Sequence, residues 1–187
     1  MHLENEANTV EVDLWYTSVI DLGLNFSNEL TALADSFSPT HPNVPLFTPR
    51  IASFPCKDCG PENCLSGGKY CAYAPRFEKS YGLEEESTHF NLTGREILIQ
   101  ALREKCLHKL MAQKYKNDAG FFWTFYWYLR RCFIEDGVTA TSFNECFDWT
   151  TVLLSGEEHI TELNNCFDSA FEIPGDLDSN NKMLEAD

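Results

Sequence analysis

Eight cysteines are the residues of this chain whose type and spacing could do chemistry. Cysteine thiolates bind zinc, exchange disulfides or form structural cross-links. A tetrahedral zinc site would need two closely spaced pairs, and only Cys56 and Cys59 have that spacing here. We therefore expect disulfides and no metal site. The cysteines form two groups of four: Cys56, Cys59, Cys64 and Cys71, then Cys106, Cys132, Cys146 and Cys166.

The segment Cys56-Lys-Asp-Cys59 also has the spacing of a redox dithiol. In a working redox site of this kind, the pair follows the first strand and lies at a helix N-terminus, where the dipole lowers the thiol pKa. Here the pair follows the second predicted strand, and residues 20–24, after the first, contain no cysteine. The sequence therefore predicts no catalytic residue, with a thiol-disulfide oxidoreductase as the alternative.

The charge of the chain restricts its partners. It carries 29 acidic and 14 basic residues, a formal net charge of -15. Such a surface repels phosphate groups, so we expect no nucleic acid and no direct membrane contact by this segment. A basic peptide or protein is the favoured partner. The five histidines are scattered without metal-ligand spacing, and no cofactor is predicted.

An even number of cysteines is typical of an oxidising lumen. Two possible glycosylation sequons, at Asn25 and Asn91, fit that compartment. The longest apolar run, residues 121–129, is too short to span a bilayer, and the polar N-terminus is not a signal peptide. We expect this chain to be a fragment of a longer protein, with its signal and any membrane anchor elsewhere.

The cysteines must be positioned by two different kinds of structure. After an N-terminal extension (1–9), β-branched and aromatic residues predict strands at 10–18 and 46–54, the second interrupted by Pro49. Helical periodicity begins near Phe26 and ends at Pro39. Strand, helix and strand within residues 10–54 form a βαβ unit with a parallel strand pair.

Residues 55–92 contain four cysteines and several glycines, which predict a loop held by cross-links rather than by a core. Residues 93–171 read as four helices with one cysteine each, and Thr93-x-x-Glu96 is a capping box. Eight cysteines allow 105 pairings, and we expect each group to pair mostly within itself. The segment 172–187 is an acidic and nearly featureless tail.

The second of these helices, at about 120–133, is apolar on all sides. Such a helix is typically buried on every side. The alternative is an exposed aromatic face that binds a peptide or a lipid.

These segments, in this order, resemble the central lumenal domain of vacuolar sorting receptors. The resemblance lies in Gly68-Lys-Tyr-Cys71-Ala, in the helix Gly94 to Cys106, and in Trp123 and Trp127 before Arg131-Cys132. It continues through Cys146 and Cys166 to Gly175-Asp176, and upstream it includes Val12-Asp-Leu-Trp15 and Phe47-Thr-Pro-Arg50. It covers residues 10–187, and all eight cysteines have counterparts.

The resemblance implies a partial thioredoxin-like α/β fold, mostly helical by residue count, with a disulfide-stapled helical insertion. It implies a domain of a membrane-anchored receptor that carries soluble hydrolases through the Golgi to vacuolar or endosomal compartments. The family has a Cys-Gly-Pro-x-Cys after its first strand, and this chain has no cysteine there. The chain also stops where the family continues into a further strand, so we expect either a truncated chain or a partner that completes the sheet.

We therefore expect a non-catalytic lumenal domain that helps to bind or present cargo sorting peptides, beside the other lumenal domains of its receptor. Asp21 lies in the loop that replaces the redox site, where it could pair with an arginine of the cargo. A saposin-like lipid-binding module is a further alternative. Its six-cysteine framework is confined to helices, whereas the helices here have four.

Overall fold

In a computed structural model, the described residues are 11–16, 46–73, 92–114, 128–129, 132, 140–156 and 158–186. Several predictions lie outside them: the N-terminal extension, the helix between the two strands and most of the aromatic helix. Of that aromatic helix, Tyr128, Leu129 and Cys132 are described and helical, and Leu129 is fully buried.

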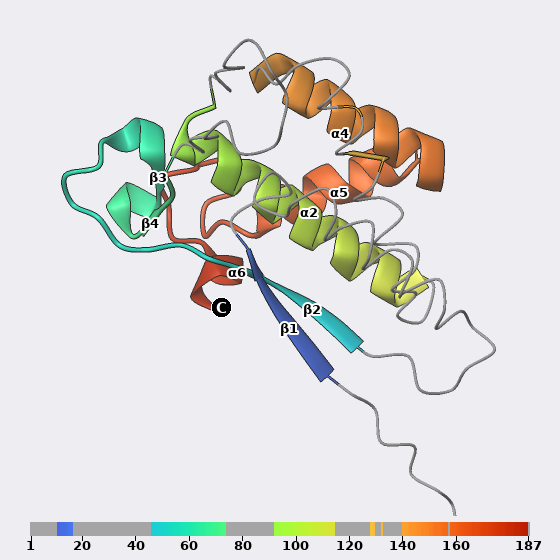
Figure 1. The fold of residues 1–187 in the computed structure, drawn as a ribbon, viewed down its shortest axis with the longest axis horizontal. Helices are drawn as coiled ribbons and strands as arrows, with labels where there is room; N and C mark the ends of the chain where they lie inside the picture. Colours follow the sequence, from blue (N-terminus) through green and yellow to red (C-terminus); the bar gives the residue numbers. More distant parts are fainter. Residues whose placement is uncertain are drawn as a thin grey trace, which may run out of the picture.

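Two parallel strands form one edge of the molecule (Figure 1). β1 is Glu11–Tyr16 and β2 is Leu46–Ile51. Glu11 is opposite Leu46 and Tyr16 is opposite Ile51, so the predicted parallel pairing is confirmed. Parallel neighbours need a long crossover connection, which the intervening residues provide. β2 ends at Ile51 rather than at residue 54, and Pro49 lies within it without ending it.

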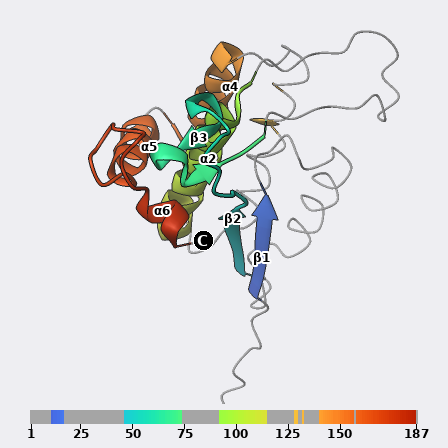
Figure 2. The same cartoon turned by 90° about the vertical axis from the view of Figure 1, so that its left-hand side faces the viewer.

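The helix α2, Gly94–Lys114, is the central element, with the strand pair on one side and the helix α5, Glu158–Ser169, on the other (Figures 1 and 2). Beside its apolar residues, this helix also buries polar or charged ones, namely Gln100, Arg103 and Glu104. The apolar side chains meet those of β2, the loop 52–73 and the C-terminal residues in one core. The helix α2 therefore positions β2, the loop and the C-terminal residues relative to one another. The core residues are Ile51, Leu65, Tyr70, Ala72, Leu98, Ala101, Leu102, Phe171 and Leu184.

The first turn of α2 has the predicted capping box. The Thr93 backbone N–H donates to Glu96 Oε2 at 2.7 Å, and the Glu96 N–H donates to Thr93 Oγ1 at 3.2 Å. The two contacts satisfy donors that the helix geometry leaves without an intrahelical acceptor. The Gly94 N–H donates to Asn63 Oδ1 at 3.1 Å, so this helix start is also joined to the loop.

A further helix, α4, Ala140–Ser155, packs on α5, and α5 packs on α2. Both α4 and α5 are among the four helices predicted in residues 93–171. Arg103 of α2 reaches α4, where it donates to Asn144 Oδ1 at 2.7 Å and pairs with Asp148. Burial lowers the pKa of Arg103, while the charge of Asp148 opposes that shift.

The prediction of a nearly featureless tail at 172–187 is wrong. The segment contains a short helix, α6 (Lys182–Glu185). The N–H groups of Met183 and Leu184 both donate to Asn181 Oδ1 at 3.0 Å. Leu184 is buried in the core, and Phe171 forms a β-bridge with Asn181. The acidic composition of the segment obscured two apolar residues, Met183 and Leu184, that hold it on the domain.

The prediction that the loop is held by cross-links rather than by a core is also wrong. Its described part contains two short strands, β3 (Cys64–Leu65) and β4 (Tyr70–Cys71), and two 3-10 turns, η2 (Pro61–Asn63) and η3 (Ser66–Gly68). Leu65 and Tyr70 lie opposite each other in the antiparallel pair, and both are buried. The two disulfides of the loop therefore reinforce a small core.

Candidate functional site

All eight cysteines are closed in four disulfides. The pairs are Cys56–Cys59, Cys64–Cys71, Cys106–Cys166 and Cys132–Cys146. Each stays within one of the two groups distinguished in the sequence. The third joins α2 to α5, and the fourth joins Cys132 to α4. No thiol is left as a nucleophile or a zinc ligand.

We call residues 52–73 the cysteine-rich loop; it projects from one end of α2 (Figure 1). Its hairpin turns through Ser66, Gly67 and Gly68, which all have positive φ. The turn lies against the beginning of the cysteine-rich loop, because the Cys56 N–H donates to Gly68 O at 3.0 Å. A Cβ on Gly68 would be 2.9 Å from Cys56 O, so this approach requires glycine.

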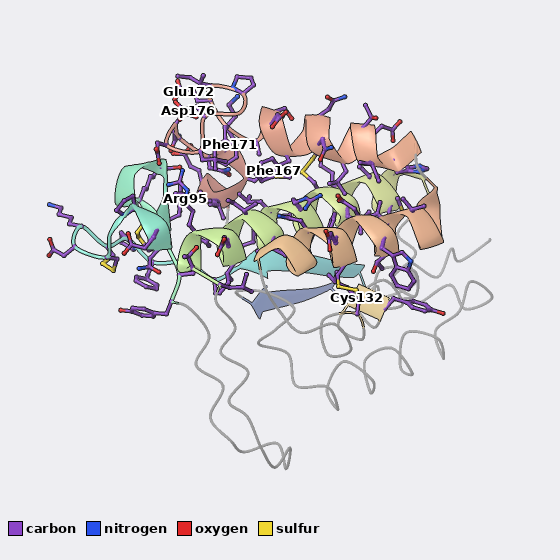
Figure 3. All side chains as sticks on the ribbon, turned by 90° about the horizontal axis from the view of Figure 1, so that it is seen from above. Arg95, Cys132, Phe167, Phe171, Glu172 and Asp176 are labelled. Atoms are coloured by element: carbon purple, nitrogen blue, oxygen red, sulfur yellow. A yellow bond between two sulfur atoms is a disulfide. The ribbon has the colours of Figure 1, made fainter. Side chains whose placement is uncertain are left out.

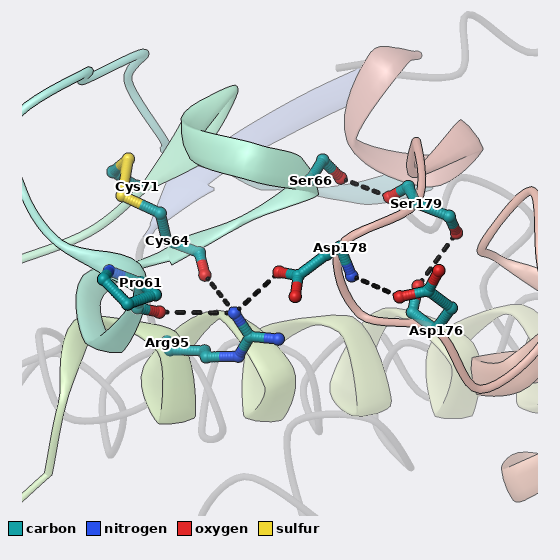
Figure 4. Close-up of polar contacts among 8 residues, drawn as sticks. All are labelled: Pro61, Cys64, Ser66, Cys71, Arg95, Asp176, Asp178 and Ser179. Atoms are coloured by element: carbon teal, nitrogen blue, oxygen red, sulfur yellow. Dashed lines mark hydrogen bonds and ion pairs between the residues drawn. A yellow bond between two sulfur atoms is a disulfide. The ribbon is translucent and has the colours of Figure 1, made fainter.

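The second component is the C-terminal segment, which we define as residues 170–186. It is hydrogen-bonded to the hairpin of the cysteine-rich loop. The Ser66 hydroxyl donates to Ser179 O at 2.8 Å (Figure 4). The Ser66 N–H donates to Leu177 O at 3.0 Å. One residue of the turn thus binds two carbonyl groups of a segment more than a hundred positions away.

Arg95 joins three parts of this arrangement (Figure 4). Its Nη1 donates to Pro61 O at 3.2 Å, to Cys64 O at 3.0 Å and to Asp178 Oδ1 at 2.9 Å. The Arg95 side chain is 21% exposed and that of Asp178 is 66% exposed, so the ion pair lies at the protein surface. The guanidinium therefore holds α2, the cysteine-rich loop and the C-terminal segment together.

A second cation, Lys69, binds the same segment from the turn. Its Nζ donates to Asn180 Oδ1 at 2.9 Å and to Glu185 Oε1 at 3.2 Å. The pKa of Lys69 is raised by the Tyr70 side chain and by Glu185. The pKa of Glu185 is lowered, because its carboxylate accepts from Lys69 and from Asn180. These groups are exposed, so water and salt screen the pair.

Removing the Arg95 side chain is expected to destabilise the domain. Arg95→Ala deletes three charge-assisted contacts, two of them to main-chain carbonyls of the cysteine-rich loop, and should cost about 2 kcal/mol in the free energy of unfolding. Urea denaturation followed by circular dichroism measures the loss. Lys182→Ala, which removes an exposed cation from α6, is the matched control and should cost under about 0.5 kcal/mol. Equal effects in both variants would contradict the bridging role of Arg95.

The outer surface of this arrangement is acidic. Glu172 and Asp176 lie on the outer side of the C-terminal segment, while Phe167 and Phe171 turn inward toward α2 (Figure 3). The rings of the two phenylalanines are 5.5 Å apart, edge to face. Within the described residues, the exposed carboxylates form no cluster that could hold a metal ion. The surface is suited to cationic groups of a protein or peptide. The exposed carboxylates are Asp58, Glu62, Glu145, Glu162, Asp168, Glu172, Asp176, Asp178 and Glu185.

Three residues singled out in the sequence, Asp21, Asn25 and Asn91, lie outside the described residues. Conversely, the sequence reasoning missed Arg95, Lys69 and Ser66 as the residues that join the loop to the C-terminal segment. Arg95 alone gave a signal. A cation in the first turn of a helix faces the positive end of the helix dipole, so its presence there indicates a specific acceptor.

Among the residues that the structure describes, no helix is long and apolar enough to cross a membrane.

Comparison with known proteins places the chain in a family. The family model that matches is described as the vacuolar sorting receptor thioredoxin-like domain, and it matches residues 10–187. The match begins just before β1 and includes the cysteine-rich loop, the helices and the C-terminal segment. No curated protein matches the chain.

Proposed function

Since the chain belongs to the family of vacuolar sorting receptor thioredoxin-like domains, we propose that it is a non-catalytic lumenal domain of such a receptor, which helps to bind or present cargo sorting peptides. The observation that carries the proposal is the family match across residues 10–187. The closure of all eight cysteines supports the non-catalytic part. We place the domain in the lumen between the Golgi and vacuolar or endosomal compartments, beside the other lumenal domains of the same receptor.

Electrostatics supports cationic cargo. The net charge of -15 gives the domain a negative potential that attracts Arg-containing peptides and raises their rate of encounter. The attraction alone does not distinguish one cationic peptide from another. Selectivity requires a local contact, and Asp21, which follows β1 in the sequence, is our proposed partner for a cargo arginine. The sequons at Asn25 and Asn91 remain proposed glycosylation sites.

Asp21→Ala is expected to weaken binding of an Arg-containing sorting peptide about three- to fivefold, the range of a partly exposed ion pair. Fluorescence anisotropy with a labelled peptide measures the affinity. Glu145→Ala is the matched control, because it removes one carboxylate from an exposed position of α4, outside the acidic surface of the C-terminal segment. It should change the affinity less than twofold. Equal losses in the two variants, or none in Asp21→Ala, would show that Asp21 does not pair with the peptide.

Two other functions make different predictions for the same protein. A thiol-disulfide oxidoreductase would reduce insulin in the presence of a thiol donor. A saposin-like module would sediment with liposomes. The receptor domain should do neither while it binds the peptide.

A further inference from the structure

The four disulfides differ in their exposure to solvent. Cys56 and Cys59 are both partly exposed, and Lys57 and Asp58 between them are exposed. Each other disulfide has at least one buried cysteine. Their buried members are Cys64 (3% exposed), Cys71 (0%), Cys106 (0%) and Cys146 (2%). A dissolved thiol must approach one sulfur along the S–S axis, and the Cys56–Cys59 bridge alone has no buried cysteine at either end, so it offers two sulfurs to attack.

The four disulfides also differ in what they hold together. Cys56 and Cys59 are three residues apart within one loop, whereas Cys106 and Cys166 are sixty apart and join two helices. A bridge that closes a short loop restricts the unfolded chain least. Opening the Cys56–Cys59 bridge therefore costs the fold less than opening any of the other three.

Both halves of this bridge are also held by contacts that do not involve sulfur. The Cys56 N–H donates to Gly68 O at 3.0 Å. Cys59 O accepts from Asn63 Nδ2 at 2.8 Å. These bonds keep the two residues near each other when the S–S bond is open, so the bridge can close again. Neither bond depends on the oxidation state of the cysteines.

We propose that the Cys56–Cys59 disulfide is a thiol-exchange site, which a small thiol or a protein dithiol opens reversibly while the other three disulfides stay closed. A thiolate attacks one of the two sulfur atoms and forms a mixed disulfide with it. The S–S bond breaks, and the other cysteine leaves as a thiolate and takes up a proton. A second thiolate then releases the first cysteine and forms the oxidised disulfide of the reagent. The protein gains two electrons, and the two reagent thiols lose them.

This site is a substrate of exchange rather than a catalyst, so it is compatible with a receptor domain. It makes no use of cargo binding, and its failure would leave the proposed function unaffected. The two residues between the cysteines, Lys57 and Asp58, carry opposite charges that cancel locally.

The test is to incubate the whole chain with increasing concentrations of reduced glutathione, quench with N-ethylmaleimide and map each cysteine by mass spectrometry. We expect glutathione or maleimide on Cys56 and Cys59 at concentrations at least tenfold lower than those that label any other cysteine. Far-ultraviolet circular dichroism should be unchanged at those concentrations.

The double variant Cys56→Ala/Cys59→Ala is the control, and it should show no labelling in the low concentration range. The proposal is overturned if another bridge opens first, if all four open over one range, or if no cysteine is labelled until the domain unfolds. Each of these outcomes would place the Cys56–Cys59 bridge among the structural disulfides.

Discussion

Gly94→Ala is expected to destabilise the domain by about 3 kcal/mol or more, a large share of the roughly 5–15 kcal/mol that holds a typical domain folded. A Cβ at this position would lie 1.8 Å from Ala72 O and 3.0 Å from Asn63 O. Both obstacles are main-chain carbonyls, so no side-chain rotation relieves the overlap. The cysteine-rich loop would have to move away from the first turn of α2. Urea denaturation monitored by circular dichroism measures the loss.

Gly67→Ala is the matched control for this prediction. Gly67 lies in the same loop, and a Cβ there would meet no atom within 4 Å, although its φ of +62° is unfavourable for alanine. The control should therefore cost about 1 kcal/mol, the strain of a left-handed residue. If Gly94→Ala costs no more than Gly67→Ala, the close contact between α2 and the loop is not present in solution.

The second large effect is expected from the disulfide that joins α2 to α5. Cys106 and Cys166 are sixty residues apart, and closing a loop of that size stabilises the folded state by about 4 kcal/mol through the entropy of the unfolded chain. Cys106→Ala/Cys166→Ala should lose about that amount. Cys56→Ala/Cys59→Ala, whose cysteines are three residues apart, should lose about 2 kcal/mol.

The order of these two double variants is the informative result, because both remove one disulfide and introduce two alanines. Thermal denaturation of the two variants side by side gives the comparison. A larger loss for the Cys56/Cys59 variant would mean that this bridge, and not the one between the helices, stabilises the fold. It would also weaken the case for a reversible exchange site.

Local sequence signals predicted the elements that depend on neighbouring residues. The capping box of Thr93 and Glu96 is such a signal, because its donors and acceptors are three residues apart. The parallel pairing of β1 and β2 was also predictable, since helical periodicity in the sequence between two strands favours a crossover connection. Gly67 and Gly68 correctly indicated a break in regular structure, but the prediction of an irregular loop from them was wrong. They mark the turn of a hairpin rather than an irregular loop.

Contacts between distant residues could not be predicted in this way. Arg95 and Asp178 are 83 positions apart, and Ser66 and Ser179 are 113 apart. No pattern within either segment specifies its partner. The C-terminal segment was misjudged for the same reason, since its acidic residues face solvent while Leu184 reaches a core formed by other parts of the chain. Tertiary contact, not local propensity, orders it.

The central claim, that this domain binds cationic cargo peptides, is tested most directly by isothermal titration calorimetry. An Arg-containing sorting peptide is titrated into the intact, fully oxidised chain, with a peptide of the same length and with alanine in place of arginine as the control. We predict saturable binding of the first peptide, weaker at higher salt, and at least tenfold weaker binding of the second. The absence of saturable heat, or equal affinity for both peptides, would contradict the account.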